Sequence, residues 1–275
     1  MTNYLNERWR ETLAHNGLAD FDAIWNFSAE WFEAPNRRRG GWSGVSRCEL
    51  TRPDGTRCVV FLKRQENHGT RSLGHPLRGI PTYLREFRHI MNYRKAGIPT
   101  LEPVYFGMRK VGKDERAILI TEELTGFASL EDRVQHWLKE GAPLRTARRN
   151  VLRSVAALLR KMHTQHIQHS CFFPKHIFMR VDPSGSIEVR VIDLEKSRWR
   201  FFKTVCAMRD LYSLNLLSSC WSTSDRMWFF REYLQIPRLT PYAKWLWHQI
   251  AERTRRKNRL SGKPVPLVAS ADASL

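Results

Sequence analysis

The chain has 275 residues, of which 42% are hydrophobic and 11% aromatic, so it can bury one large core or two lobes that share a cleft. It has no apolar run near the roughly 20 residues that span a bilayer, and its first residues lack a signal-peptide pattern, so we expect a cytoplasmic protein. The formal net charge of +19 predicts attraction to phosphate, in nucleic acid, in an anionic membrane face or in a phosphorylated substrate.

Composition divides the chain into four segments. Residues 1–35 form an acidic, aromatic lead-in, residues 36–124 are rich in glycine and short β-like runs, residues 125–260 show helical periodicity, and residues 261–275 predict a disordered tail. We expect the lead-in to contribute packing and no chemistry. A β-rich segment joined to a helical one predicts an α+β fold with two lobes.

The β-rich segment begins with a glycine cluster, Gly40, Gly41 and Gly44. Backbone amides in such a cluster can approach phosphate oxygens, but a glycine cluster before a hairpin is more often a tight turn. The next β-like runs flank Pro53-Asp54-Gly55, which is a hairpin signal because glycine accepts the positive φ of the turn. The second of these runs is predicted to end at Lys63.

Lys63 has a candidate partner in Glu86. Residues 64–81 are polar and basic and predict a long loop, whereas residues 83–93 predict an amphipathic helix that carries Glu86. An ion pair between the two side chains would aim the lysine at the phosphates of a nucleotide. A lysine and a glutamate that each face water are the alternative that the sequence leaves open.

The β-rich segment ends at a break between strands and helices. Glu122 and Leu124 lie at this break, after strand candidates at residues 104–107 and 117–121, and the break is the natural place for a hinge between lobes. Helical patterns then cover residues 129–140, 146–166, 202–222, 224–234 and 240–257.

The most informative segment lies between the second and third of these helices. It reads His169-Ser170-Cys171-Phe172-Phe173-Pro174-Lys175-His176 and is followed by a predicted hairpin and then by Asp193. A carboxylate that follows an apolar strand is well placed to bind Mg²⁺, although it could instead cap the next helix. Imidazole is a poor Mg²⁺ ligand, so His176 is expected beside the metal, bonded to phosphate or to Asp193. Asp210 is expected to anchor the backbone of this loop, with a solvated aspartate as the alternative.

The ordered set of these residues resembles the protein-kinase-like fold and, within it, the bacterial lipopolysaccharide core (heptose and Kdo) kinase family, including its InaA-like members. In that family the catalytic loop ends in His, as at His176, and Leu follows the metal-binding aspartate, as in Asp193-Leu194. The resemblance implies a bilobal α+β kinase-like fold that uses ATP and Mg²⁺. It implies a nucleotide-binding role for Gly40, Gly41, Gly44, Lys63, Glu86, Glu122 and Leu124, a metal-binding role for Asp193 and His176, and a catalytic role for His169, Cys171, His176 and Asp193.

Cys171 departs from the family pattern, because members with assigned sugar-kinase activity carry Asp at this position. A buried thiol tends to stay protonated and accepts a proton poorly. The first hypothesis is nevertheless an ATP-dependent kinase of a sugar hydroxyl in the lipopolysaccharide inner core, at the cytoplasmic membrane face. The alternative is a pseudokinase, a nucleotide-binding or regulatory protein of the same fold without turnover.

The expected partners follow from charge. The basic stretch 64–78, with Lys196, Arg198 and Arg200, is predicted to meet lipopolysaccharide core or another anionic sugar-lipid, and the net charge predicts peripheral contact with an anionic membrane face. Nucleic acid is a third hypothesis, prompted by basic residues near 253–257 and by ten tryptophans. We disfavour it because tryptophans such as Trp245 fall at spacings typical of a helical core. The sequence does not indicate the oligomeric state.

Overall fold

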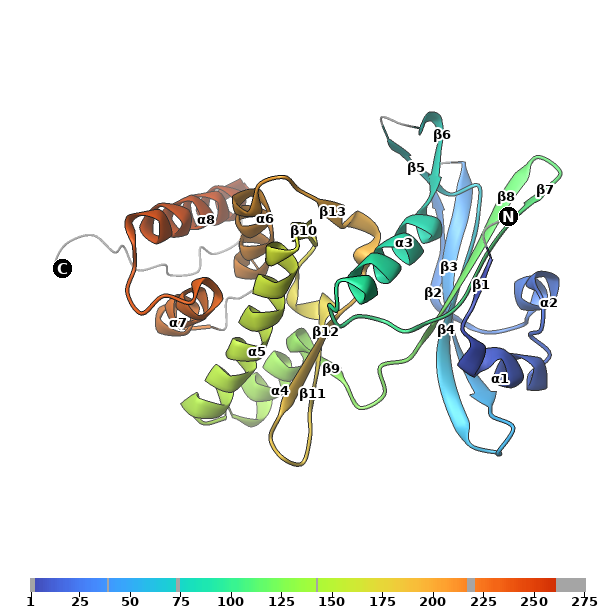
Figure 1. Cartoon of the computed structure of the whole chain (residues 1–275), viewed down its shortest axis with the longest axis horizontal. Helices are drawn as coiled ribbons and strands as arrows, with labels where there is room; N and C mark the ends of the chain where they lie inside the picture. Colours follow the sequence, from blue (N-terminus) through green and yellow to red (C-terminus); the bar gives the residue numbers. More distant parts are fainter. Residues whose placement is uncertain (1–2, 39, 73–74, 142, 217–220, 261–275) are drawn as a thin grey trace. The chain divides into compact units, whose positions relative to one another are not determined.

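The computed structural model describes residues 3–38, 40–72, 75–141, 143–216 and 221–260 (Figure 1). The chain divides into two compact units, which we call the sheet unit and the helical unit. The sheet unit comprises Met1–Lys95 and Thr100–Thr125, and the helical unit comprises Ala96–Pro99 and Gly126–Leu275. The tail predicted to be disordered lies outside the described residues.

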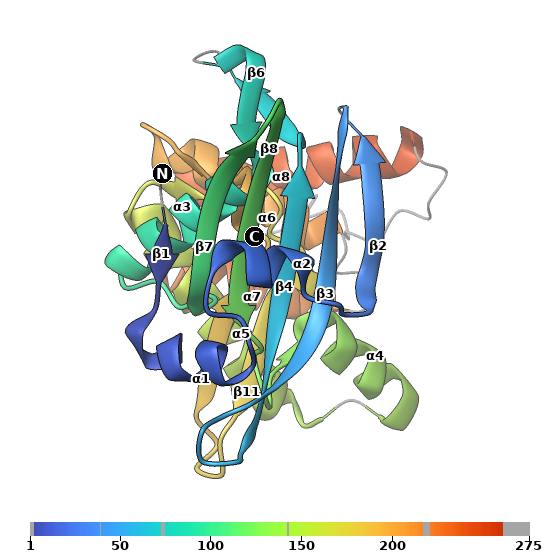
Figure 2. The same cartoon turned by 90° about the vertical axis from the view of Figure 1, so that its right-hand side faces the viewer.

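The sheet unit is built on six strands in the order β1-β7-β8-β4-β3-β2, with every neighbouring pair antiparallel (Figure 2). Their bounds are Tyr4–Leu5 (β1), Trp31–Arg38 (β2), Gly41–Thr51 (β3), Arg57–Glu66 (β4), Pro103–Val111 (β7) and Asp114–Glu122 (β8). The predicted turn at Gly55, whose φ is +82°, joins β3 to β4. The two strand candidates before the predicted hinge are confirmed as β7 and β8, and both are longer than predicted.

The lead-in covers one face of this sheet. A short 3₁₀ helix (Glu7–Trp9) and helices α1 (Arg10–His15) and α2 (Phe21–Asn26) bury Leu13 and Ile24 in a core with inward-facing residues of β4 such as Leu62. The lead-in therefore belongs to the same unit as the residues that follow it, and the predicted boundary between residues 35 and 36 falls inside β2.

Helix α3 (Thr82–Lys95) is confirmed and lies on the opposite face of the sheet from α1 and α2 (Figure 1). The prediction of a long loop at residues 64–81 is wrong. Strand β4 continues to Glu66, and β5 (Gly69–Ser72) and β6 (His75–Pro81) pair with each other in an antiparallel ladder. The two strands pair through their backbones, and the polar, glycine-rich sequence of the hairpin gives no apolar alternation that reveals it.

The helical unit holds five helices and two small sheets within its described residues, β12-β11-β9 and β10-β13. The helices are α4 (Leu130–Glu140), α5 (Arg145–Thr164), α6 (Lys203–Leu216), α7 (Thr223–Leu234) and α8 (Pro241–Leu260). The strands are β9 (Ala128–Ser129), β10 (Ile167–Gln168), β11 (Ile177–Val181), β12 (Ile187–Val191) and β13 (Arg198–Trp199), and short 3₁₀ turns span Pro174–His176 and Leu194–Lys196. The hairpin predicted before Asp193 is confirmed as β11 and β12.

Two predictions in this unit need correction. The helix predicted to reach residue 222 is described only to Leu216, and Ser222 is instead the N-cap of α7, whose Oγ accepts from Asp225 N at 3.1 Å. Trp245, predicted to lie in the core, is 46% exposed because α8 turns Leu246 and Ile250 inward instead.

Among the residues described, no helix combines the length and apolar character needed to cross a membrane.

Candidate functional site

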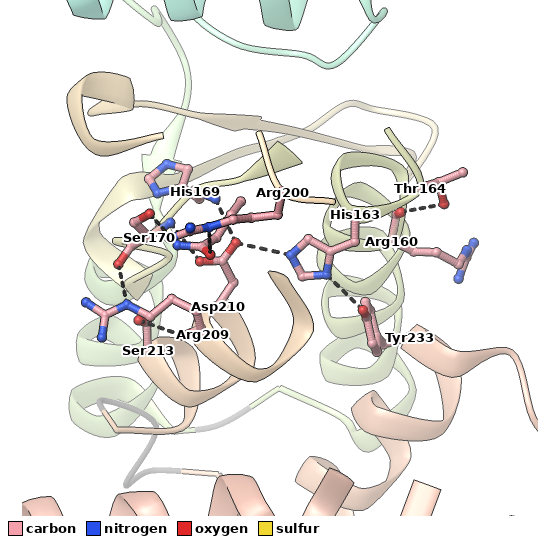
Figure 3. Close-up of polar contacts among 11 residues, drawn as sticks. Arg160, His163, Thr164, His169, Ser170, Arg200, Arg209, Asp210, Ser213 and Tyr233 are labelled. Atoms are coloured by element: carbon pink, nitrogen blue, oxygen red, sulfur yellow. Dashed lines mark hydrogen bonds and ion pairs between the residues drawn. The ribbon is translucent and has the colours of Figure 1, made fainter. Parts of the chain in front are cut away.

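Asp210 anchors the loop that begins at His169. The carboxylate projects from α6 and is fully buried. Its Oδ2 accepts the backbone N–H of His169 at 2.7 Å, and its Oδ1 accepts that of Ser170 at 2.8 Å (Figure 3). Two charge-assisted hydrogen bonds to consecutive amides fix the direction in which the loop leaves β10. The predicted anchoring role of Asp210 is confirmed.

A third donor reaches Asp210 from a residue that the sequence did not single out. His163 on α5 is buried, and its Nε2 lies 3.1 Å from Asp210 Oδ2 while its Nδ1 lies 2.8 Å from the hydroxyl of Tyr233 (Figure 3). Asp210 is a carboxylate and accepts, so His163 donates to it from Nε2. Burial raises the pKa of Tyr233, so its hydroxyl stays protonated in its hydrogen bond with Nδ1. The only sequence signal was a histidine on the apolar side of a helix, beside the buried Leu159.

His169 is a buried structural member of the loop. Its Nε2 donates to the backbone carbonyl of Ile192 at 3.0 Å, which ties the start of the loop to the residue before Asp193. Burial is the main reason that the pKa of His169 is lowered, and the neighbouring Asp210 opposes the shift. The ring is therefore neutral at pH 7. Its Nδ1 is buried and has no hydrogen-bond partner among the described residues.

Two residues of the site have left-handed backbone conformations. Ser170 has a φ of +71° and Asp193 a φ of +59°, a region that costs energy for residues other than glycine. Ser170 is held there by the hydrogen bond from its backbone N–H to Asp210 and by Arg209, whose Nε donates to the Ser170 carbonyl at 3.2 Å. Asp193 makes no side-chain cap to the 3₁₀ turn that follows, so the alternative of a helix cap is wrong.

Asp193 and His176 face each other, as predicted. His176 Nε2 lies 3.4 Å from Asp193 Oδ2, and the aspartate side chain remains 40% exposed. The other ring nitrogen, Nδ1, lies 2.9 Å from the carbonyl oxygen of Cys171 and must donate to it. A neutral His176 would therefore turn a lone pair toward a carboxylate. The arrangement is favourable when His176 is protonated on both nitrogens or when a cation lies between the two groups.

Cys171 lies in the loop with its side chain nearly buried, at 7% exposure. Burial raises the pKa of its thiol, and the nearby Lys196 opposes the shift without reversing it. The thiol is therefore protonated at pH 7 and is not a general base in this state. Two hydrogen bonds to backbone carbonyls bring the predicted catalytic residues of this unit together. His169 bonds to the carbonyl of Ile192, next to Asp193, and His176 bonds to the carbonyl of Cys171.

The ion pair predicted in the sheet unit is confirmed. Lys63 Nζ lies 2.6 Å from Glu86 Oε1, with the two side chains 17% and 5% exposed. Lys63 does not end its strand, because β4 continues through Glu66 between β3 and β8. Side chains alternate along a strand, so Lys63 points away from the face that buries Leu62 and toward the face that α3 covers. The nucleotide-binding role of the pair stays a prediction.

The fold explains why glycine is present at each of the three positions predicted to bind phosphate. Gly40 has a φ of +78° beside the end of β2. A Cβ on Gly41 would lie 2.1 Å from the carbonyl oxygen of Glu66, and a Cβ on Gly44 would lie 2.5 Å from the ring of Trp31. Larger residues would therefore disturb the β2-β3-β4 ladder. The phosphate-binding role of Gly40, Gly41 and Gly44 stays a prediction beside this packing role.

The remaining predicted residues lie at the end of the sheet unit. Glu122 is the last residue of β8 and pairs with Val60, and Leu124 follows it just before the unit ends at Thr125. Their contribution to a nucleotide site stays a prediction.

The basic stretch predicted to meet the substrate is partly buried. Arg64 and His68 are each 7% exposed, and Arg64 Nη1 donates to the carbonyls of Trp25 and Phe27, both at 2.8 Å. These two side chains are part of the sheet unit's interior, so the prediction that they contact the substrate is wrong. The reason is that β4 carries Arg64 onto the inward face of the sheet.

Comparison with solved structures shows the fold. The fold matches a structure described as WaaP in complex with acyl carrier protein, with a TM-score of 0.67 and 22% identity, over 94% of this chain and 99% of that one. The predicted bilobal α+β fold of the kinase-like class is confirmed.

Comparison of sequences defines the family. The model of the lipopolysaccharide kinase (Kdo/WaaP) family matches residues 22–233. Protein InaA of Escherichia coli K12 is 32% identical over 71% of this chain and 86% of its own length. The lipopolysaccharide core heptose(I) kinase WaaP of the same strain is 30% identical over 68% of this chain and 75% of its own. The chain belongs to the lipopolysaccharide kinase (Kdo/WaaP) family.

Proposed function

We propose that this protein transfers the γ-phosphoryl group of ATP to a sugar hydroxyl of the lipopolysaccharide inner core at the cytoplasmic membrane face. The family supports a kinase of lipopolysaccharide core. The observation that carries the proposal is Asp193, a half-exposed carboxylate held in a left-handed conformation after β12 and facing His176. A carboxylate kept accessible on a costly backbone conformation is a typical functional group.

The residues present suit a nucleotide and its metal. Mg²⁺ is usually bound by one or two carboxylates together with phosphate oxygens and water, so Asp193 is a sufficient protein ligand. The described residues contain no cluster of three or more His, Cys, Asp or Glu side chains that could hold a metal without a nucleotide. Bound Mg²⁺ would neutralise charge that develops on the phosphates. His176, fixed by the Cys171 carbonyl, would then lie beside the metal and donate to phosphate oxygen when protonated.

One charged pair and one anchored loop would serve the proposed reaction. In the sheet unit, Glu86 orients Lys63, which would bind the phosphates. In the helical unit, the loop from His169 to His176 would position the acceptor hydroxyl, and Asp210 holds that loop. A loose phosphoryl-transfer transition state depends mainly on position and charge, so transfer can proceed without a strong base at position 171.

The test measures phosphate transfer from labelled ATP to core lipopolysaccharide, together with the rise in melting temperature caused by ATP and Mg²⁺. Asp193→Asn is the informative variant, because asparagine also tolerates the left-handed region while losing the charge. We expect it to abolish both signals. Glu131→Gln, which neutralises an exposed carboxylate of α4, is the matched control and should keep both. Wild-type protein that neither transfers phosphate nor is stabilised by millimolar ATP contradicts the proposal.

One observation favours the alternative of a pseudokinase. The Cys171 thiol is buried and protonated, so the position that would accept the substrate proton holds no base. Cys171→Asp should raise phosphotransfer by up to roughly 10²- to 10⁴-fold, the range that a positioned general base supplies. Cys171→Ala should leave a slow wild-type rate nearly unchanged. No gain in Cys171→Asp, with ATP still bound, would support a binding protein without turnover.

A further inference from the structure

The helical unit exposes a group of large aromatic side chains next to the candidate site. Trp199 is 65% exposed, Phe201 71% and Phe202 65%, although aromatic residues of this size are usually buried. Phe201 contacts both of the other rings, with centroids 6.3 Å apart for Trp199 and Phe201 and 4.9 Å apart for Phe201 and Phe202. They therefore form one apolar patch on the end of β13 and on the segment that joins β13 to α6. Figure 1 shows the course of this segment.

The patch continues onto the N-terminal end of α8. Thr204 Oγ1 lies 3.0 Å from the Tyr242 hydroxyl, which connects the start of α6 to α8. Tyr242 is 47% exposed and Trp245 46%, and their rings lie 5.9 Å apart. Val205 adds an aliphatic side chain that is 41% exposed.

The charged residues on the segments that carry these rings are basic. The segment from Lys196 to Arg209 contains no Asp or Glu, and Lys196, Arg198 and Lys203 on it are exposed. Lys244 on α8, between Tyr242 and Trp245 in sequence, is exposed as well. We call these residues together the aromatic-basic surface: Lys196, Arg198, Trp199, Phe201, Phe202, Lys203, Val205, Tyr242, Lys244 and Trp245.

The composition of this surface fits a membrane better than a protein partner. Protein interfaces favour aromatic residues and arginine but are depleted in lysine, and three of the four basic residues here are lysines. At a bilayer surface, aromatic rings lie at the level of the head groups while lysine and arginine side chains reach anionic phosphates. The exposed rings and the absence of carboxylates on the segment from Lys196 to Arg209 match such a surface.

The same surface is connected to the loop of the candidate site by short covalent and hydrogen-bonded paths. Strand β13 pairs with β10, with Trp199 opposite Ile167 and Arg198 opposite Gln168, and Gln168 directly precedes His169. The ring of Trp199 also stacks on His166 at a centroid distance of 5.7 Å. Lys196 is three residues after Asp193 and influences the Cys171 thiol electrostatically. A membrane bound at this surface would hold the loop close to the head groups.

We propose that the aromatic-basic surface docks the protein on an anionic phospholipid bilayer, with the rings at the interface and the lysines and arginine on lipid phosphates. The docking deepens the proposed function, because it would present a membrane-embedded sugar-lipid to the site. It requires neither nucleotide nor turnover, so its test is independent of the kinase test. Anchoring through one small patch is weak and reversible, so the protein also dissociates from the bilayer.

The test is flotation with vesicles of phosphatidylglycerol and phosphatidylethanolamine, without nucleotide and at low salt, compared with vesicles of phosphatidylcholine alone. Wild-type protein should bind the anionic vesicles, and binding should fall as salt rises. The triple variant Trp199→Ala, Phe201→Ala and Phe202→Ala should bind at least about tenfold more weakly. Its melting temperature should stay near that of the wild type, because the three side chains are exposed.

A charge variant with a matched control separates local docking from general attraction. Arg198→Ser with Lys203→Ser should weaken vesicle binding by about fivefold per charge. Lys110→Ser with Lys113→Ser removes two exposed charges of the sheet unit and should have a much smaller effect. Equal losses in the two double variants would overturn the proposal, because binding would then depend on net charge alone.

Two further results would overturn it. The first is a triple aromatic variant that binds anionic vesicles as well as the wild type. The second is a wild-type dimer that the triple variant converts to a monomer in sedimentation velocity, because a second copy of the chain would then be the occupant of this surface.

Discussion

Asp193 and Asp210 belong to the same unit, and their carboxylates have opposite surroundings. Asp210 is fully buried on a helix and accepts from two backbone amides and one histidine. Asp193 is 40% exposed at its side chain, follows a strand on a left-handed backbone, and has His176 at 3.4 Å. A satisfied, buried carboxylate fixes a structure, whereas an accessible and incompletely paired one is available to a ligand. Burial and pairing, more than residue type, thus separate the two roles.

Asp210→Ala should show the largest effect on stability. The change leaves two buried amide donors and one ring donor without an acceptor, so the free energy of unfolding should fall by about 3–5 kcal/mol. Urea denaturation at 25 °C measures the loss, and Asp182→Ala, at an exposed turn, is the control. Where Asp210→Ala does not fold, Asp210→Asn should show a smaller loss of the same sign. A loss under about 1 kcal/mol in Asp210→Ala would mean that Asp210 does not stabilise the fold more than Asp193 does.

Acid should destabilise the anchored loop through His169. Burial lowers the pKa of His169 below its ordinary 6.5, so the unfolded chain binds this proton more readily than the folded one. The contribution of His169 to stability is therefore complete above pH 6.5 and is lost as the pH falls below it, by up to about 1.4 kcal/mol per pH unit. Unfolding measured between pH 8 and pH 5 should show a shallower slope in His169→Gln than in the wild type. Equal slopes would place His169 outside the buried network.

The contribution of Glu86 to the free energy of unfolding should lie between those of Asp210 and Asp193, because Glu86 is nearly buried and has one charged partner. A double-mutant cycle of Lys63→Met and Glu86→Gln should give a coupling energy of about 1–2 kcal/mol in unfolding. The more exposed pair of Arg47 and Glu123, whose Nε and Oε1 are 2.7 Å apart, is the control and should couple more weakly. Additive effects at Lys63 and Glu86 would mean that the pair does not order the sheet unit.

Asp193→Asn should have the smallest effect on stability. The side chain is partly exposed and makes no cap, so the free energy of unfolding should change by no more than about 0.5 kcal/mol. The same variant should lose the stabilisation by ATP and Mg²⁺, which separates ligand binding from folding. A large loss of stability without ligand would show that Asp193 is an anchor of the same kind as Asp210.

Patterns that are local in sequence predicted most of the elements. The hairpin around Gly55, helix α3 and the strand pair before Asp193 were predictable because turn residues and apolar periodicity report directly on local conformation. The hairpin of β5 and β6 was missed, since its backbone pairing leaves no apolar alternation in residues 69–81. The outward position of Trp245 was missed as well, because the face of α8 that becomes buried depends on the helix packed against it.

The candidate site was also predictable only in part. The order of Lys63, Glu86, His169, His176 and Asp193 in the sequence predicts phosphotransfer chemistry, which stays a prediction. The role of His163 could not be read from the sequence, because it depends on α5 approaching Asp210 and Tyr233, which lie 47 and 70 residues away.

The sequence by itself determined the residue types of the site and their order, including a cysteine in place of a carboxylate at position 171. It also determined most of the regular elements, because these depend on composition and on the spacing of a few residues. The tertiary structure alone decided which side chains are buried. Arg64 lies in the interior of the sheet unit and Asp210 is buried with three donors, whereas Asp193 stays accessible and Phe201 is exposed. The physical reason is that burial and pairing are set by segments distant in sequence. A side chain's free energy in the fold therefore depends on neighbours that its own segment does not specify.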